Sequence, residues 1–166
     1  MRPRERRARL TGETPMNLWS LASSFHQCAL TLMQADAMTR LGSGELPTFY
    51  LLCHGLELGM KAHLRAQGMT ASDLRGLGHD LTRIQAAAKQ RGLARAIAFT
   101  DTDDVVIKIL SPVYSGKHLE YVIQRGLMSL PRIQLIEDLL NRMLKATEQE
   151  CREATMREVA SRRASG

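Results

Sequence analysis

The sequence is poor in the residue types on which several kinds of protein depend. Of its 166 residues three are cysteines, and three Tyr, three Phe and one Trp make up an aromatic content of 4%. Cys28, Cys53 and Cys151 are far apart and form no Cys-x-x-Cys pair, which argues against a disulfide framework or a zinc ribbon and fits a reducing cytoplasm. The low aromatic content argues against a platform on which nucleic-acid bases stack.

Several sequence motifs are also missing. There is no apolar run long enough to cross a bilayer, and the basic N-terminus is not followed by the apolar segment of a secretory signal. The chain contains no Gly-x-Ser-x-Gly, no phosphate-binding P-loop and no strand followed by Gly-x-Gly-x-x-Gly. We therefore expect neither a membrane protein, nor a serine hydrolase, nor a Rossmann-type enzyme.

Positive charge is concentrated at the N-terminus. The formal net charge is +6, and residues 1–10, "MRPRERRARL", hold five Arg and one Glu. Residues 1–15 are therefore interpreted as a basic arm. Such an arm either contacts phosphates or is a solvated, disordered terminus.

Apolar residues recur at helical spacing through most of the chain, and no segment has the pattern of a β-rich domain. The sequence predicts an all-α, up-and-down bundle of about five helices over residues 16–146, followed at 147–166 by a helix extension or a frayed tail. Pro112 is expected to end or kink the fourth helix. The segment 114–126 fits either a helical turn or a short strand. The predicted helices cover residues 16–39, 47–67, 80–92, 100–112 and 130–145.

The stretch "LLCHGLELGMKAHLRAQG" (51–68) has an unusual charge pattern. His54, Glu57 and Lys61 recur at steps of three and four along a mostly apolar helix, which places them on one face. They either form a solvated stripe with one favourable i,i+4 pair or line a semi-buried polar seam near the start of the third helix. Gly55 and Gly59, four residues apart, favour the second reading because they allow a neighbouring helix to approach closely.

The same stretch, followed by "LGHDLTRIQAAAKQRGL" (77–93), resembles the helical HEPN domains (higher eukaryotes and prokaryotes nucleotide-binding). In that family a central helix carries a Glu, three residues, then a Lys, and leads into a "GHDL" helix start. The segment "LEYVIQRG" (119–126) is similar to the family's aromatic segment before its last helix. The resemblance covers about residues 16–146. The residues that match the first two motifs are Glu57, Lys61, Gly78, His79, Asp80 and Leu81.

The resemblance implies an up-and-down helical bundle that forms a homodimer. It also implies work on RNA or a nucleotide, beside a nucleotidyltransferase-type partner protein in a bacterial toxin–antitoxin or defence system. On that basis the candidate polar site consists of His54, Glu57, Lys61, His79, Asp80, His118 and Tyr121.

Catalytic members of the family carry an Arg, four to six residues, then a His, and this chain departs from that pattern. Arg75 and His79 have only three residues between them, and His118-x-x-Tyr121 has no Arg at the required distance upstream. We therefore expect an accessory module without ribonuclease activity. The alternatives are an active ribonuclease with a degenerate motif and a helical interaction protein that binds no ligand.

Two further interpretations stay open. Asp80 can simply cap the third helix while His79 reaches back to the second, and Tyr121 can be a buried anchor with a bonded hydroxyl. A histidine metal site would have to be assembled from separate helices, because the Glu-x-x-His pairs of di-iron bundles are absent. We expect no metal and no cofactor.

Overall fold

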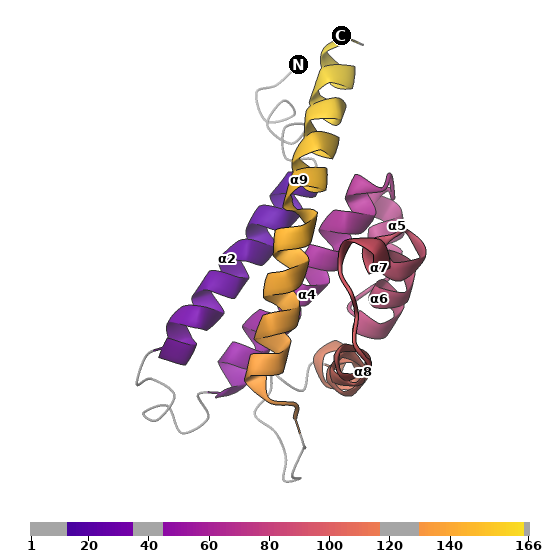
Figure 1. Ribbon diagram of the computed structural model, residues 1–166. Helices are drawn as coiled ribbons and strands as arrows, with labels where there is room; N and C mark the ends of the chain where they lie inside the picture. Colours follow the sequence, from indigo (N-terminus) through magenta and orange to yellow (C-terminus); the bar gives the residue numbers. More distant parts are fainter. Residues whose placement is uncertain (1–12, 35–44, 117–129, 165–166) are drawn as a thin grey trace.

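The protein is an all-α helical bundle. The computed structural model describes residues 13–34, 45–116 and 130–164, and no β-strand occurs among them (Figure 1). The helices in chain order are α2 (Pro15–Gln34), α4 (Glu45–Ala66), α5 (Ala71–Gly76), α6 (Leu81–Gln90), α7 (Leu93–Ala96), α8 (Asp101–Ser115) and α9 (Ile133–Ala164).

Three long helices, α2, α4 and α9, pack side by side and form the main core (Figure 1). α2 runs antiparallel to α9, since the main-chain N–H of Met16 bonds Thr155 whereas His26 pairs with Glu137. α4 is antiparallel to α2 but parallel to α9, because the chain between them returns to the start of the bundle. The simple up-and-down order thus holds for α2 and α4 only. Helices α5 to α8 then lead the chain from the end of α4 back to the level at which α9 begins.

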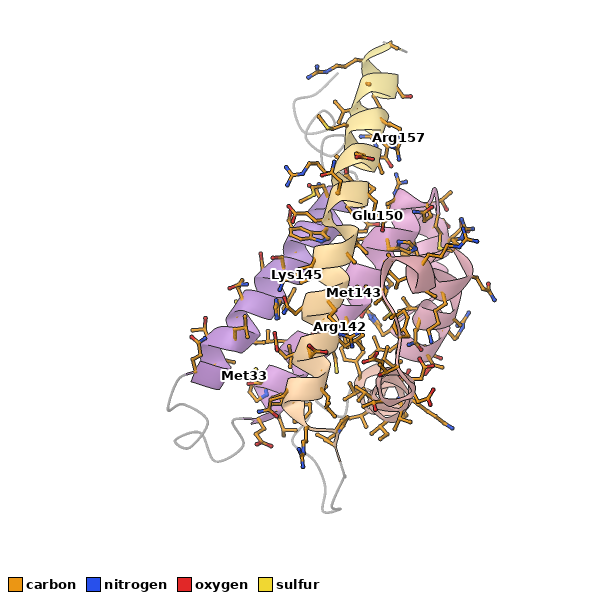
Figure 2. The ribbon with its side chains drawn as sticks, in the orientation of Figure 1. Met33, Arg142, Met143, Lys145, Glu150 and Arg157 are labelled. Carbon is orange, nitrogen blue, oxygen red and sulfur yellow. The ribbon has the colours of Figure 1, made fainter. Side chains whose placement is uncertain are left out.

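Two glycines allow α4 to sit at the centre. A Cβ atom on Gly55 would lie 2.7 Å from Leu140 Cδ2, and one on Gly59 would lie 2.5 Å from Met143 Cε. Met143 and Glu150 mark successive parts of α9 (Figure 2), and Glu150 bonds His63 of α4. The expected close helix approach at these glycines is confirmed. A glycine in a helix interior costs about 1 kcal/mol relative to Ala, which the packing offsets.

Helices α5 to α8 cover another side of α4. α6 packs on α4 and α8 packs on α6, with α8 seen almost end-on in Figure 1, across the long helices. Thr100 caps α8 in a capping box with Asp103. The expectation that Pro112 ends or kinks this helix is wrong as regards its end, because α8 continues to Ser115. Pro112 lies on the exposed side near the last turn, and buried Val113 and Tyr114 beyond it hold the turn in place.

The last helix is longer than its apolar pattern suggests. α9 continues without a break to Ala164, and its final turns project beyond the other helices (Figure 1). Thr147, Cys151 and Ala154 are buried at steps of four and three. Small residues therefore continue the packed stripe after the large apolar ones stop at Leu144. Of the described helices, none has the length and hydropathy needed to cross a membrane.

Candidate functional site: a buried glutamate that collects four polar side chains

The site is built around Glu57 in the middle of α4. This residue is 2% exposed, since α4 is covered by other helices on most sides. A buried carboxylate is costly unless donors surround it. The side chains around Glu57 supply those donors from α4, from the turn before α6 and from α8.

Three donors lie within hydrogen-bond distance of the carboxylate. Lys61 Nζ is 2.6 Å from Oε1, and the Tyr114 hydroxyl is 2.6 Å from Oε2. His79 Nδ1 is 3.1 Å from Oε1 and 3.0 Å from Oε2. Burial by itself would raise the pKa of Glu57, but these contacts outweigh it and hold the pKa well below the usual range. Glu57 is therefore ionised at neutral pH.

Lys61 ties the helix to the turn that carries His79. Its Nζ also donates to the main-chain oxygen of Gly78 at 2.8 Å, and its side chain is 12% exposed. Gly78 has φ +63°, a left-handed conformation that suits glycine. Lys61 thus fixes the position of His79, the residue that follows Gly78.

His79 is the member of the site that reaches the surface. Its side chain is 62% exposed, although Nδ1 faces the buried carboxylate. An anionic oxygen facing Nδ1 requires a proton on that nitrogen, so a neutral ring carries the lone pair on Nε2. Nε2 can then accept a hydrogen bond from a ligand, and in the protonated ring it can donate one to an anion.

His54 completes the site through Tyr114. Its Nδ1 is 2.6 Å from the Tyr114 oxygen and 3.8 Å from Glu57 Oε2, too far for a direct hydrogen bond to the carboxylate. The ring also packs edge-to-face on Phe25, with centroids 4.5 Å apart, and stacks with Tyr50 at 5.9 Å. His54 is consequently fixed by packing and acts on Glu57 indirectly.

Asp80 has a structural position beside the site. Its carboxylate caps α6 by accepting from the main-chain N–H groups of Thr82 and Arg83, and it also accepts from the Ser111 hydroxyl of α8. These bonds lower the pKa of Asp80 against the opposing effect of burial. Asp80 therefore joins α6 to α8 and does not contact Glu57 in the structure.

Four of the residues predicted from the sequence meet around Glu57 or include it, and one member of the cluster was not predicted. His54, Glu57, Lys61 and His79 form one cluster, whereas His118 and Tyr121 lie outside the described residues. The tyrosine that bonds Glu57 is Tyr114. The sequence does contain a signal for Tyr114. Ile107, Leu110 and Tyr114 are spaced by three and four residues, so they continue one buried helix face past Pro112.

Two other histidine–carboxylate pairs support the bundle away from this site. His26 Nε2 lies 2.8 Å from Glu137 Oε1 between α2 and α9, and His63 bonds Glu150 between α4 and α9. Within the described ranges, no three His, Cys, Asp or Glu side chains are grouped to hold a metal ion.

The comparisons with known proteins give no further guide. No protein-family model, curated protein or solved structure matches this chain. Chemically, the site offers an exposed imidazole held by a buried carboxylate, beside an ammonium group that is largely covered.

Proposed function

We propose that the chain is a HEPN-like helical module that works as an RNA- or nucleotide-linked accessory protein of a bacterial toxin–antitoxin or defence system. The observation that carries the proposal is the Glu57–Lys61–His79 cluster. These residues carry the resemblance in sequence, and they meet in space although 22 positions separate Glu57 from His79.

Exposed His79 is the group through which the site contacts its ligand. A nucleotide offers hydroxyl and amino groups that can donate to Nε2, and phosphate oxygens that can accept from the protonated ring. The tyrosine, the lysine and the glutamate act as positioning residues. They fix the ring and set its tautomer.

We propose that this module does not cleave RNA. The family's catalytic spacing of Arg and His is absent from the sequence. The motif therefore supplies no arginine to stabilise the negative charge that develops on a phosphate during cleavage. The second candidate, a ribonuclease with a degenerate motif, is favoured by one observation. A carboxylate that holds Nδ1 while Nε2 is exposed is the arrangement of a general base.

Binding and cleavage are tested with one substitution at His79. His79→Asn keeps an N–H donor for Glu57 but removes Nε2. Wild-type protein should bind a mixed RNA pool or a panel of nucleotides, and His79→Asn should weaken binding about tenfold with an unchanged melting temperature. Unchanged binding by His79→Asn would remove His79 from the ligand site.

Cleavage is measured on the same RNA pool without added metal. We expect none. Metal-independent cleavage by purified protein, lost in His79→Asn or in His118→Ala, would establish the ribonuclease instead. The third candidate, an interaction protein without a ligand, would be established if wild-type protein bound neither RNA nor any nucleotide.

We propose a homodimer and a nucleotidyltransferase-type partner for the same module. Exposed apolar side chains support an interface: on α8, Val105 is 54% and Ile109 is 38% exposed, and one turn separates them. Light scattering should give twice the 18.5 kDa chain mass. The described cysteines are unpaired, which supports a reducing cytoplasm as the place of action.

A further inference from the structure

The projecting end of α9 carries an exposed apolar groove (Figure 1). The volume of this groove is about 640 Å³. Met156 is 66% exposed and Val159 is 40% exposed, and the two side chains lie one turn apart on the helix. The residues that line the groove are Thr155, Met156, Val159, Ala160, Arg163 and Ala164. Of these six, only Arg163 is charged.

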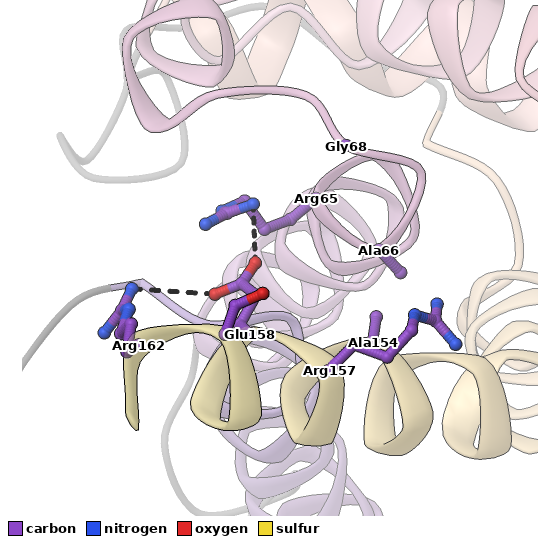
Figure 3. Close-up of a pocket in the computed structure, with 8 residues that line it drawn as sticks. Arg65, Ala66, Gly68, Ala154, Arg157, Glu158 and Arg162 are labelled. Carbon is purple, nitrogen blue, oxygen red and sulfur yellow. Dashed lines mark ion pairs between the residues drawn. The ribbon is translucent and has the colours of Figure 1, made fainter. Parts of the chain in front are cut away.

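The opposite face of the same helix end is held against α4. Glu158 Oε1 lies 2.7 Å from Arg65 Nη1 of α4, and Glu158 Oε2 lies 3.6 Å from Arg162 Nη2 (Figure 3). This contact fixes which side of α9 is turned toward the bundle, so Met156 and Val159 face away from α4. Apolar side chains that are exposed together on a fixed helix face are typical of an interaction surface.

Two charged residues on the exposed face lack an ion-pair partner. Glu153 lies three residues before Met156, and Arg163 lies three residues after Ala160, so all four share one side of the helix. Both charged side chains are exposed, and neither forms an ion pair with any of the described residues. The one hydrogen bond there is uncharged on its donor side, from Gln149 Nε2 to Glu153 Oε1 at 2.8 Å. Glu153 and Arg163 can therefore pair with charges of another chain.

The order of these residues is self-complementary. Glu153, Met156, Ala160 and Arg163 follow at steps of three, four and three, the spacing of the seam in a coiled coil. Positions 153 and 163 are equally far from position 158, and so are positions 156 and 160. In an antiparallel pair of α9 helices centred there, Glu153 of each copy meets Arg163 of the other, and Met156 meets Ala160. Val159 lies closest to the two-fold axis, beside Val159 of the other copy.

The apolar pair on α8 lacks this symmetry. Lys108 is the one basic residue of α8, and about the midpoint of Val105 and Ile109 it falls opposite Val106 in an antiparallel pair. Two copies of α8 would therefore meet without an opposite-charge pair to fix their register. The charges favour α9 over α8 as the surface between two copies.

We propose that two copies of the chain associate through the ends of their α9 helices, packed antiparallel, with Met156 and Val159 in the contact. Two Glu153–Arg163 ion pairs lie at its edges. The inference rests on the proposed function, which supplies the homodimer, and assigns the interface to α9. A pair of helix ends is smaller than a standard interface, so the dimer dissociates on dilution. The plain alternative is a solvated helix end, on which single exposed apolar side chains are ordinary.

Charge reversal tests the register of the two helices. The molar mass of the full chain is measured by light scattering over a range of protein concentrations for Glu153→Arg, for Arg163→Glu and for the double variant. Either single reversal sets like charges against each other in both pairs, so the dissociation constant of the dimer should rise at least about tenfold. The double variant restores opposite charges and should recover the wild-type constant. Thermal melting of all three variants checks that the bundle is intact.

Cysteine cross-linking tests the antiparallel arrangement independently. The background is Cys28→Ser, in which the remaining native thiols, Cys53 and Cys151, are buried. Val159→Cys should form a disulfide-linked dimer on mild oxidation, because the two copies of position 159 lie about 3 Å apart along the axis. Gln149→Cys is the matched control on the same exposed face. Its two copies lie about 27 Å apart along the axis, beyond the reach of a disulfide.

The opposite results are separable. A dimer that is unaffected by the single reversals, or that cross-links through Gln149→Cys as readily as through Val159→Cys, would overturn the α9 interface. If Val105→Ser/Ile109→Ser alone dissociated the dimer, the interface would lie on α8 and the proposed homodimer would stand. Wild-type protein that is monomeric at every concentration would overturn both the inference and the homodimer. Binding of RNA or a nucleotide is decided separately, by the measurement on His79→Asn.

Discussion

The Tyr114 hydroxyl lies 2.6 Å from Glu57 Oε2 and 2.6 Å from His54 Nδ1. A phenol has a single proton, so when it donates to the carboxylate it must accept from the imidazole. His54 therefore carries a proton on Nδ1. The three side chains form one chain of hydrogen bonds directed from His54 through Tyr114 toward the buried negative charge, and chains of this kind strengthen one another in a low-dielectric interior.

Removing the phenol proton should weaken this chain measurably. We expect Tyr114→Phe to lower the free energy of unfolding by about 1.5–3 kcal/mol, as for other hydrogen bonds to a charged group. Tyr50→Phe is the matched control, because among the described residues the Tyr50 hydroxyl makes no hydrogen bond while its ring also packs near His54. Urea unfolding of both variants gives the comparison. Equal losses would mean that the Tyr114 hydroxyl bond contributes nothing beyond packing.

Lys61→Met addresses the other side of the carboxylate. The substitution keeps most of the side-chain volume but leaves Glu57 without its cation and Gly78 without its donor. We expect a loss of about 3 kcal/mol in urea unfolding, the lower end for breaking a buried pair, because Tyr114 and His79 remain. Lys108→Met, at an exposed position of α8, should cost less than about 0.5 kcal/mol. A loss below about 1 kcal/mol for Lys61→Met would indicate a solvated pair.

Much of this site could be predicted from the sequence, for physical reasons that particular residues illustrate. The spacing of Glu57 and Lys61 fixes a shared helix face, and "GHDL" fixes the helix start that brings His79 near. Tyr114 was missed because Pro112 was expected to stop α8. A proline costs about 3 kcal/mol in a helix interior, and near an exposed end the burial of Val113 and Tyr114 offsets that cost. Local rules do not include such distant contacts.

The length of α9 shows a second limit of the pattern. Large apolar residues stop at Leu144, so the hydropathy pattern predicts that the helix frays beyond that residue. Thr147, Cys151 and Ala154 nevertheless pack fully, since small side chains allow α9 to lie close to its neighbours.

Acid should destabilise the bundle through Glu57. Its folded pKa lies below the unfolded value of about 4.3, so the unfolded chain binds a proton at a higher pH than the folded chain does. The stabilisation is complete above that unfolded value and is lost as pH falls toward the folded pKa. Unfolding free energies measured from pH 7 to pH 3 should fall more steeply for wild type than for Glu57→Gln. Identical slopes would exclude Glu57 as a source of the acid sensitivity.

A second variant can be measured in the same way, and its result does not depend on whether Glu57→Gln folds. Tyr114→Phe removes one of the donors that lower the pKa of Glu57, so its folded pKa lies closer to the unfolded value. The acid-induced loss of stability should therefore be smaller than in wild type and should level off at a higher pH. Tyr50→Phe should follow the wild-type curve. A Tyr114→Phe curve parallel to wild type across the acid range would contradict the assigned role of the hydroxyl.

Thiol reactivity tests the packing of the last helix. Cys28 is exposed, whereas Cys53 and Cys151 are buried, and burial raises the pKa of both buried thiols to about 12; the neighbouring Glu150 charge adds to the effect at Cys151. Since the thiolate is the reactive form, a native sample at neutral pH should react with a disulfide reagent at Cys28 alone, and at all three cysteines after denaturation. Cys28→Ser should abolish the native reaction. Fast labelling of Cys151 in that variant would show that α9 opens beyond Leu144.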